Sequence, residues 1–188
     1  MSETRVKNVE KVVVRFSGDS GDGMQLAGNI FSNISAAIGN EISTFPDYPA
    51  EIRAPQGTLG GVSGFQVHIG NGVHTPGDKA DVLVAMNPAA LKTNFKFLKS
   101  DGIVIYDTDS FTKSDLDKAA FTTEDPFAEI GAAATVQIVP VALSSMVAAS
   151  LADSGMDNKS IMRCKNMFAL GLVCWLFNRD IPAAEAML

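Results

Sequence analysis

The chain contains little cysteine and little histidine, and these shortages exclude several kinds of site. Its 188 residues include two cysteines, Cys164 and Cys174, and two histidines. Both cysteines fall in one expected helix, where a rise of ~1.5 Å per residue separates them by about 15 Å, too far for a mutual disulfide. Two cysteines are also too few for an iron–sulfur cluster held by four thiolates. We interpret them as buried thiols in a reducing compartment, and no metal site is predicted.

Two further absences concern charge and long apolar segments. No block of lysine or arginine offsets the formal net charge of −6, so a nucleic-acid partner is not expected. The first residues carry no apolar segment of the secretory type. The longest apolar run, Met167–Phe177, is well short of the ~20 residues that cross a bilayer. We therefore expect no membrane association and a cytoplasmic protein.

What the sequence does contain is an alternation of short β-branched runs and helical periodicities. Hydrophobic residues make up 46% of the chain, which suits a single domain over residues 1–188. We expect a doubly wound, Rossmann-like α/β fold, with a mostly parallel sheet and helices on both faces. A strand at residues 62–69 that pairs back through residues 73–75 would form an inserted β-hairpin. The expected parallel strands are 12–16, 41–45, 81–86, 103–106 and 135–139, and the expected helices are 26–38, 88–98, 114–121, 141–151 and 158–177.

A glycine-rich turn follows the first expected strand, where such folds commonly bind ligands. It contains Gly18, Gly21, Asp22 and Gly23. The spacing differs from the dinucleotide fingerprint, and acidic side chains beside a helix N-terminus offset the dipole that attracts a pyrophosphate. Three interpretations stay open: a nucleotide site, a tight turn that lets another backbone, subunit or ligand approach closely, or a purely structural turn.

A long segment rich in proline and glycine, residues 46–61, follows the second expected strand, and long loops are often functional. Arg53 is the leading candidate here, either for a carboxylate or phosphate of a ligand or for an internal ion pair with Asp47 or Glu51. Tyr48 either stacks on a ligand or packs the loop onto the core. Gln56 either bonds across an interface or faces solvent.

Asn87 stands directly after a strand and before Pro88. This pattern predicts a helix cap, and a cap at the carboxyl ends of the strands is also a possible ligand donor. The same edge of the sheet should therefore carry the glycine turn, the 46–61 segment and Asn87.

Four sequence blocks together resemble the gamma subunit or gamma domain of 2-oxoacid:ferredoxin oxidoreductases. They cover nearly the whole chain in the order of that family, closest to forms in which this domain precedes the alpha portion of a 2-oxoglutarate-type enzyme. The first turn departs from the family pattern, with Ser20-Gly-Asp-Gly23 where many members have Gly-Gly-Gln-Gly. The blocks are residues 13–28 (VVRFSGDSGDGMQLAG), 45–57 (FPDYPAEIRAPQG), 81–90 (DVLVAMNPAA) and 163–171 (RCKNMFALG).

The resemblance implies a module without catalytic residues of its own, in a complex that oxidatively decarboxylates a 2-oxoacid with coenzyme A. The products would be an acyl-CoA, CO2 and a reduced acceptor such as ferredoxin. Thiamine diphosphate and iron–sulfur clusters would lie on the alpha and beta portions, with coenzyme A contacted by this chain or by its partners. The chain would be a separate subunit or one part of a longer fusion that continues beyond residue 188.

Two other hypotheses compete with that one. An NAD(P)-dependent dehydrogenase or NAD-sensing domain would explain the turn at residues 18–23, although its acidic side chains count against it. A pure interaction domain would bind no ligand at all.

Overall fold

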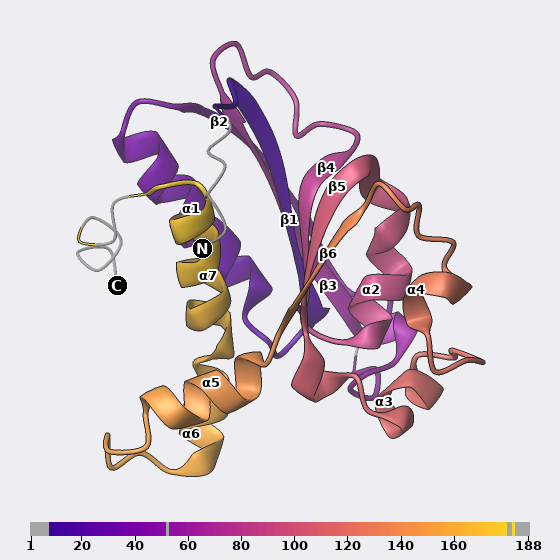
Figure 1. Ribbon diagram of the computed structural model, residues 1–188. Helices are drawn as coiled ribbons and strands as arrows, with labels where there is room; N and C mark the ends of the chain where they lie inside the picture. The colour runs from indigo at the N-terminus through magenta and orange to yellow at the C-terminus, as the bar shows by residue number, and fades with distance from the viewer. Residues whose placement is uncertain (1–7, 52, 180–181, 183–188) are drawn as a thin grey trace, which may run out of the picture.

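The computed structural model describes residues 8–51 and 53–179, together with residue 182, and its centre is a six-stranded sheet (Figure 1). The strand order is β2-β3-β1-β4-β5-β6, and β1, β4, β5 and β6 pair in parallel. Strand β3 is antiparallel to both of its neighbours, and the remaining five strands all run in the same direction. The strands are β1 (Lys11–Asp19), β2 (Glu41–Asp47), β3 (Val62–Gly70), β4 (Ala80–Ala85), β5 (Leu98–Asp107) and β6 (Gln137–Val141).

Helices cover both faces of this sheet, as expected for a doubly wound fold. In Figure 1, α1 and α7 lie on one face, α2 and α4 on the other, and α5 and α6 extend below α7. The helices are α1 (Met24–Ala37), α2 (Pro88–Asn94), α3 (Lys113–Lys118), α4 (Pro126–Glu129), α5 (Leu143–Ser150), α6 (Asn158–Arg163) and α7 (Lys165–Leu176). Short 3-10 turns are η1 (Leu59–Gly61), η2 (Phe95–Phe97) and η3 (Thr108–Ser110).

Strand β1 separates two cores because its side chains alternate between the faces. Val14 and Phe16 join the cluster formed with α1 and α7, where the Phe16 ring meets the Phe31 ring edge-on at 5.9 Å between centroids. On the α2 side, Leu83 of β4 packs with Leu91. Each of these fully buried side chains contributes roughly 1.5–3 kcal/mol of burial energy.

The prediction of an inserted β-hairpin is wrong. Residues 73–75 form no strand, and β3 lies inside the sheet between β1 and β2 instead of extending from it. Gln66 of β3 is buried, and its amide donates to the carbonyl of Pro76 at 2.9 Å. The irregular segment after β3 thus satisfies a buried polar side chain. Because β3 intervenes, β1 and β2 are also not neighbours.

The prediction of one long final helix over residues 158–177 is wrong as well. It is two helices, α6 and α7, that meet at Cys164, so the cysteines do not share one helix and both are free. Asp157 caps α6 through the amides of Lys159 and Ser160. Trp175 of α7 is 75% exposed. Among the described residues, no helix has both the length and the apolarity that crossing a membrane requires.

Candidate functional site

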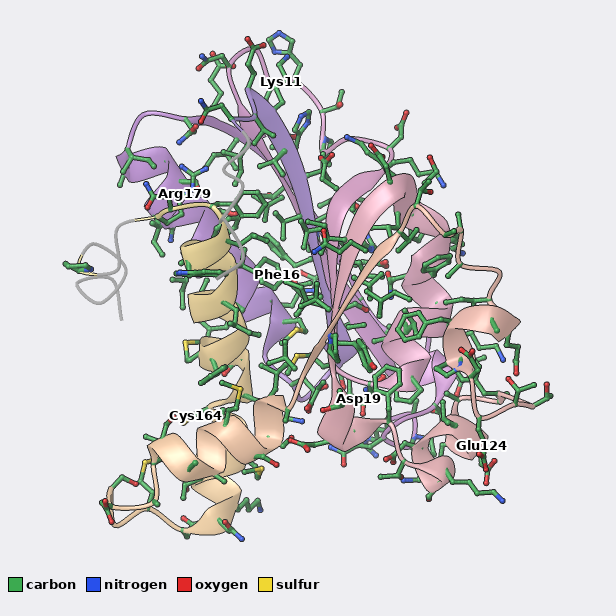
Figure 2. All side chains as sticks on the ribbon, viewed as in Figure 1. Lys11, Phe16, Asp19, Glu124, Cys164 and Arg179 are labelled. Atoms are coloured by element: carbon green, nitrogen blue, oxygen red, sulfur yellow. The ribbon has the colours of Figure 1, made fainter. Side chains whose placement is uncertain are left out.

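The carboxyl ends of β1, β4 and β5 meet at one edge of the sheet and gather polar side chains there. Asp19 ends β1, Asn87 follows β4 and Asp107 ends β5, and all three are buried. Figure 2 shows Asp19 at this edge, below the sheet. Lys165 joins them from the first residue of α7, with its ammonium 3.3 Å from a carboxylate oxygen of Asp107.

The glycine turn is shaped by two close approaches within the chain. Gly23 takes a left-handed φ of 71°, and a Cβ there would lie 2.3 Å from the side-chain nitrogen of Asn166 on α7. A Cβ on Gly18 would lie 2.7 Å from a carboxylate oxygen of Asp22. Gly21 is exposed and has more room. Close approach of another element therefore explains Gly23, and that element is the chain's own α7.

Two carboxylates occupy the turn where a dinucleotide would need donors. Asp22 accepts the backbone N–H of Asp19 at 2.8 Å, and Asp19 accepts the N–H of Gly57 at 2.9 Å. Burial raises the pKa of Asp19 and of Asp22 above the ordinary aspartate value. The second oxygen of Asp19 is buried without a hydrogen-bond partner among the described residues, although the nearby Asn87 amide favours its charged form. This arrangement disfavours a pyrophosphate at the turn, because anionic oxygens already fill it.

Asn87 caps α2, as its sequence position predicted. Its side-chain oxygen accepts the N–H of Ala90 at 2.8 Å, and the residue is 8% exposed. The cap thus holds the start of α2 beside the end of β1.

Sequence reasoning missed Asp107 and Lys165. Asp107 is fully buried and accepts hydrogen bonds from the hydroxyls of Ser110 and Ser144 at 2.8 and 2.9 Å, in addition to the Lys165 contact. A carboxylate at the last position of a parallel strand was the available signal for Asp107. Lys165 carried none, because its partner lies 58 positions away.

The 46–61 loop reaches the same edge and is fixed at several points. Asp47 at its start pairs with Arg15 of β1, and the N–H of Glu51 bonds the carbonyl of Gly60 at 3.1 Å across its neck. Near its end, Gly57 meets Asp19, and Gly61 accepts the N–H of Ser20 at 3.2 Å. The loop is therefore anchored to β1 at both ends.

The candidate side chains of this loop divide into two groups. Gln56 is exposed beside the glycine turn, where a Cβ on Gly21 would lie 3.9 Å from its amide nitrogen. Tyr48 is 70% exposed, so it does not pack the loop onto the core. Arg53 is exposed with a left-handed φ of 64°. The suggested Arg53–Asp47 pair is wrong because Asp47 pairs with Arg15, and no ion pair of Arg53 is found among the described residues.

The structure thus brings Gly18, Gly21, Asp22, Gly23, Gln56 and Asn87 to one edge, and leaves Tyr48 and Arg53 on the outer part of the loop. Within the described ranges, no group of three or more histidine, cysteine or acidic side chains could hold a metal ion. The outer loop offers the exposed guanidinium of Arg53, which suits an anionic ligand group.

Known proteins resemble this chain along most of its length. Residues 13–188 match the pyruvate ferredoxin/flavodoxin oxidoreductase family. The 2-oxoglutarate oxidoreductase subunit KorA of Mycobacterium tuberculosis is 46% identical over 183 residues, which are 97% of this chain and 28% of that protein. The chain therefore spans little more than a quarter of this relative.

Solved structures share the fold. The 2-oxoglutarate:ferredoxin oxidoreductase from Magnetococcus marinus, with 2-oxoglutarate, coenzyme A and succinyl-CoA bound, has a TM-score of 0.70 at 24% identity, over 95% of this chain and 26% of its own. The keto/oxoacid ferredoxin oxidoreductase gamma subunit from Geobacter sulfurreducens has a TM-score of 0.62 at 22% identity, over 93% of this chain and 83% of its own. The family match over residues 13–188 and the relative that is 46% identical agree with each other, and this chain belongs to the pyruvate ferredoxin/flavodoxin oxidoreductase family.

Proposed function

We propose that this chain is the gamma module of a multi-subunit 2-oxoacid:ferredoxin, or other acceptor, oxidoreductase. The complex would convert a 2-oxoacid, such as 2-oxoglutarate or pyruvate, and coenzyme A into an acyl-CoA and CO2, and pass the electrons to ferredoxin. The similarity to the mycobacterial 2-oxoglutarate oxidoreductase subunit over 97% of the chain is the observation that carries this proposal. The same similarity favours 2-oxoglutarate as the first substrate to try.

In this proposal the chain contributes a surface and leaves the redox chemistry to its partners. Thiamine diphosphate and iron–sulfur clusters belong to the alpha and beta portions. The two free cysteines of this chain lie at the end of α6 and within α7, where they share no cluster of ligands in the described residues. The module would cover the active site formed by its partners.

The 46–61 loop is our candidate for the contact with coenzyme A or with a partner subunit. Coenzyme A carries phosphate groups, and Arg53 presents an exposed guanidinium that pairs with no described carboxylate. Tyr48 adds an exposed aromatic ring on the same loop. The carboxylates of Asp19 and Asp22 would not suit phosphate, so the contact belongs to the outer loop and not to the glycine turn.

Co-purification tests the proposal. The tagged chain, produced together with the thiamine-binding portions of its own organism's 2-oxoacid oxidoreductase, should retain them through size-exclusion chromatography. A competing dehydrogenase function predicts instead that the chain alone enhances NADH fluorescence on titration. Retention without NADH binding supports the gamma module, whereas NADH binding without retention would overturn it.

A further inference from the structure

Arg15 is a buried cation in the middle of β1. The residue is 2% exposed, on the side of β1 that faces α2. Its guanidinium donates in three directions: to the side-chain oxygen of Asn94 at 2.6 Å, to that of Gln66 at 3.2 Å, and to the carboxylate of Asp47. The guanidinium carbon also lies 4.6 Å from the centre of the Phe97 ring. A buried charge of this kind is retained only where its partners satisfy it.

Asp47 connects this buried cation to the loop. It is the last residue of β2 and the point from which residues 48–60 leave the sheet. Its side chain is 42% exposed while that of Arg15 is 3% exposed, so the pair joins the core to the surface. The backbone carbonyl of Asp47 also accepts the Gln25 amide at 3.3 Å, and the same amide bonds the carbonyl of Gly64 at 2.7 Å.

The surroundings of Arg15 are shaped for a planar fork. A Cβ on Gly64 of β3 would lie 3.3 Å from the Phe16 carbonyl oxygen and 3.4 Å from the guanidinium nitrogen that reaches Asp47, so the guanidinium lies close against the backbone of β3. Burial lowers the pKa of Arg15, and the negative charge of Asp47 opposes that shift and keeps the cation charged. Lysine could reach Asp47 but could not hold Asn94 and Gln66 at the same time.

The two anchors of the loop are therefore both on β1. Arg15 pairs with Asp47 near the start of the loop, and Asp19 accepts the N–H of Gly57 near its end. Between these anchors lie Tyr48 and Arg53, which have no packing role in the core. A loop fixed in this way loses little conformational freedom when a ligand binds it.

We propose that Arg15 is a positioning residue: through Asp47 it presents the 46–61 loop, with Arg53 and Tyr48, in one fixed arrangement for the ligand or partner. The ligand side of this inference rests on the proposed function, in which that loop meets coenzyme A or a neighbouring subunit. Arg15 itself would contact neither coenzyme A nor the neighbouring subunit, since it is buried beneath Asp47.

The test compares Arg15→Met with a matched control, Lys99→Met, which removes the cation of another sheet ion pair, the 2.6 Å contact between Lys99 and Asp81. Amide hydrogen exchange is measured in the full chain. Arg15→Met should accelerate exchange in residues 48–60 by about 10- to 100-fold while α1 keeps its protection. Arg15→Lys should recover part of the protection, and Lys99→Met should leave the loop unchanged.

A second readout comes from the assembled complex. Arg15→Met should raise the KM for coenzyme A with kcat nearly unchanged, because the loop still reaches its productive arrangement but must be ordered during binding. If Arg15→Met does not fold, Asp47→Asn is the deciding variant, since it keeps one oxygen acceptor for Arg15 and removes the negative charge. Its loop exchange should rise less than in Arg15→Met but above the control.

Unchanged exchange in residues 48–60, or exchange that rises equally across the whole sheet, would overturn the proposal, because Arg15 would then support only the core. Faster loop exchange with an unchanged KM for coenzyme A has a different meaning. It would support the positioning of the loop and contradict its proposed role in binding coenzyme A.

Discussion

The carboxylate of Asp19, the last residue of β1, accepts a hydrogen bond from the backbone N–H of Gly57 at 2.9 Å, across 38 positions of sequence. This contact joins the glycine turn to the 46–61 loop, and it explains why two segments far apart in the sequence act as one edge.

The acidic turn should make stability depend on pH. Burial raises the pKa of Asp22 in the folded chain, so the folded state holds a proton that the unfolded state has already released. Folding stability should therefore fall as pH rises from the ordinary aspartate range, about 4, through the raised pKa. Asp22→Asn removes that loss while keeping an oxygen to accept the N–H of Asp19.

Thermal unfolding measures this effect. At pH 7, Asp22→Asn should have a higher melting temperature than the native chain, and the difference should disappear near pH 4. The exposed Asp153→Asn is the control and should show no such pH-dependent gain. An Asp22→Asn variant that is less stable than the native chain at pH 7 would contradict the argument.

The close approach at Gly23 predicts a larger penalty for alanine there than at another left-handed glycine. Gly23 and Gly131 have nearly equal φ, 71° and 68°, but a Cβ meets Asn166 at Gly23 and nothing within 4 Å at Gly131. Gly131→Ala should cost about 1–2 kcal/mol from backbone strain alone. Gly23→Ala should cost at least ~1 kcal/mol more, because α7 must also move. Equal losses in urea unfolding would show that the Asn166 contact is not tight.

Part of this edge was predictable because its signals are local. The Asn87-Pro88 cap depends on neighbouring residues, and it occurs as expected. The pairing of β3 with β1 joins residues about fifty positions apart, and no local pattern states which strands become neighbours. The β-branched run around Arg15 predicted a strand, but the three side chains that accept its hydrogen bonds come from three separate elements. The loop candidates were found by composition, whereas their exposure could only come from the structure.

Arg53 combines a left-handed backbone with an exposed side chain, and two substitutions separate these properties. With φ at 64°, alanine keeps the backbone strain, whereas glycine removes it. Arg53→Gly should therefore be more stable than Arg53→Ala by about 1 kcal/mol. Both variants lack the guanidinium, so their effects on coenzyme A kinetics should be equal. Differential scanning calorimetry compares them, and a glycine variant that melts below the alanine variant would contradict the backbone assignment.

The guanidinium itself should matter only in the assembled enzyme. Arg53→Ala should lower kcat/KM for coenzyme A about 10- to 100-fold, as expected for a lost charge-assisted contact of roughly 1.5–3 kcal/mol. Its melting temperature should barely change, because no described partner loses an ion pair. The exposed Lys159→Ala on α6 is the matched control and should leave both quantities unchanged. A lower melting temperature with unchanged kinetics would assign Arg53 to structure and not to binding.

Reconstitution tests the central claim most directly. Acceptor reduction is measured with a 2-oxoacid and coenzyme A, for the thiamine-binding portions alone, for this chain alone, and for both together. We predict that only the combination is active, that activity requires coenzyme A, and that the isolated chain is colourless and inactive. Full activity of the thiamine-binding portions without this chain, or 2-oxoacid oxidation by this chain alone, would contradict its assignment as the gamma module.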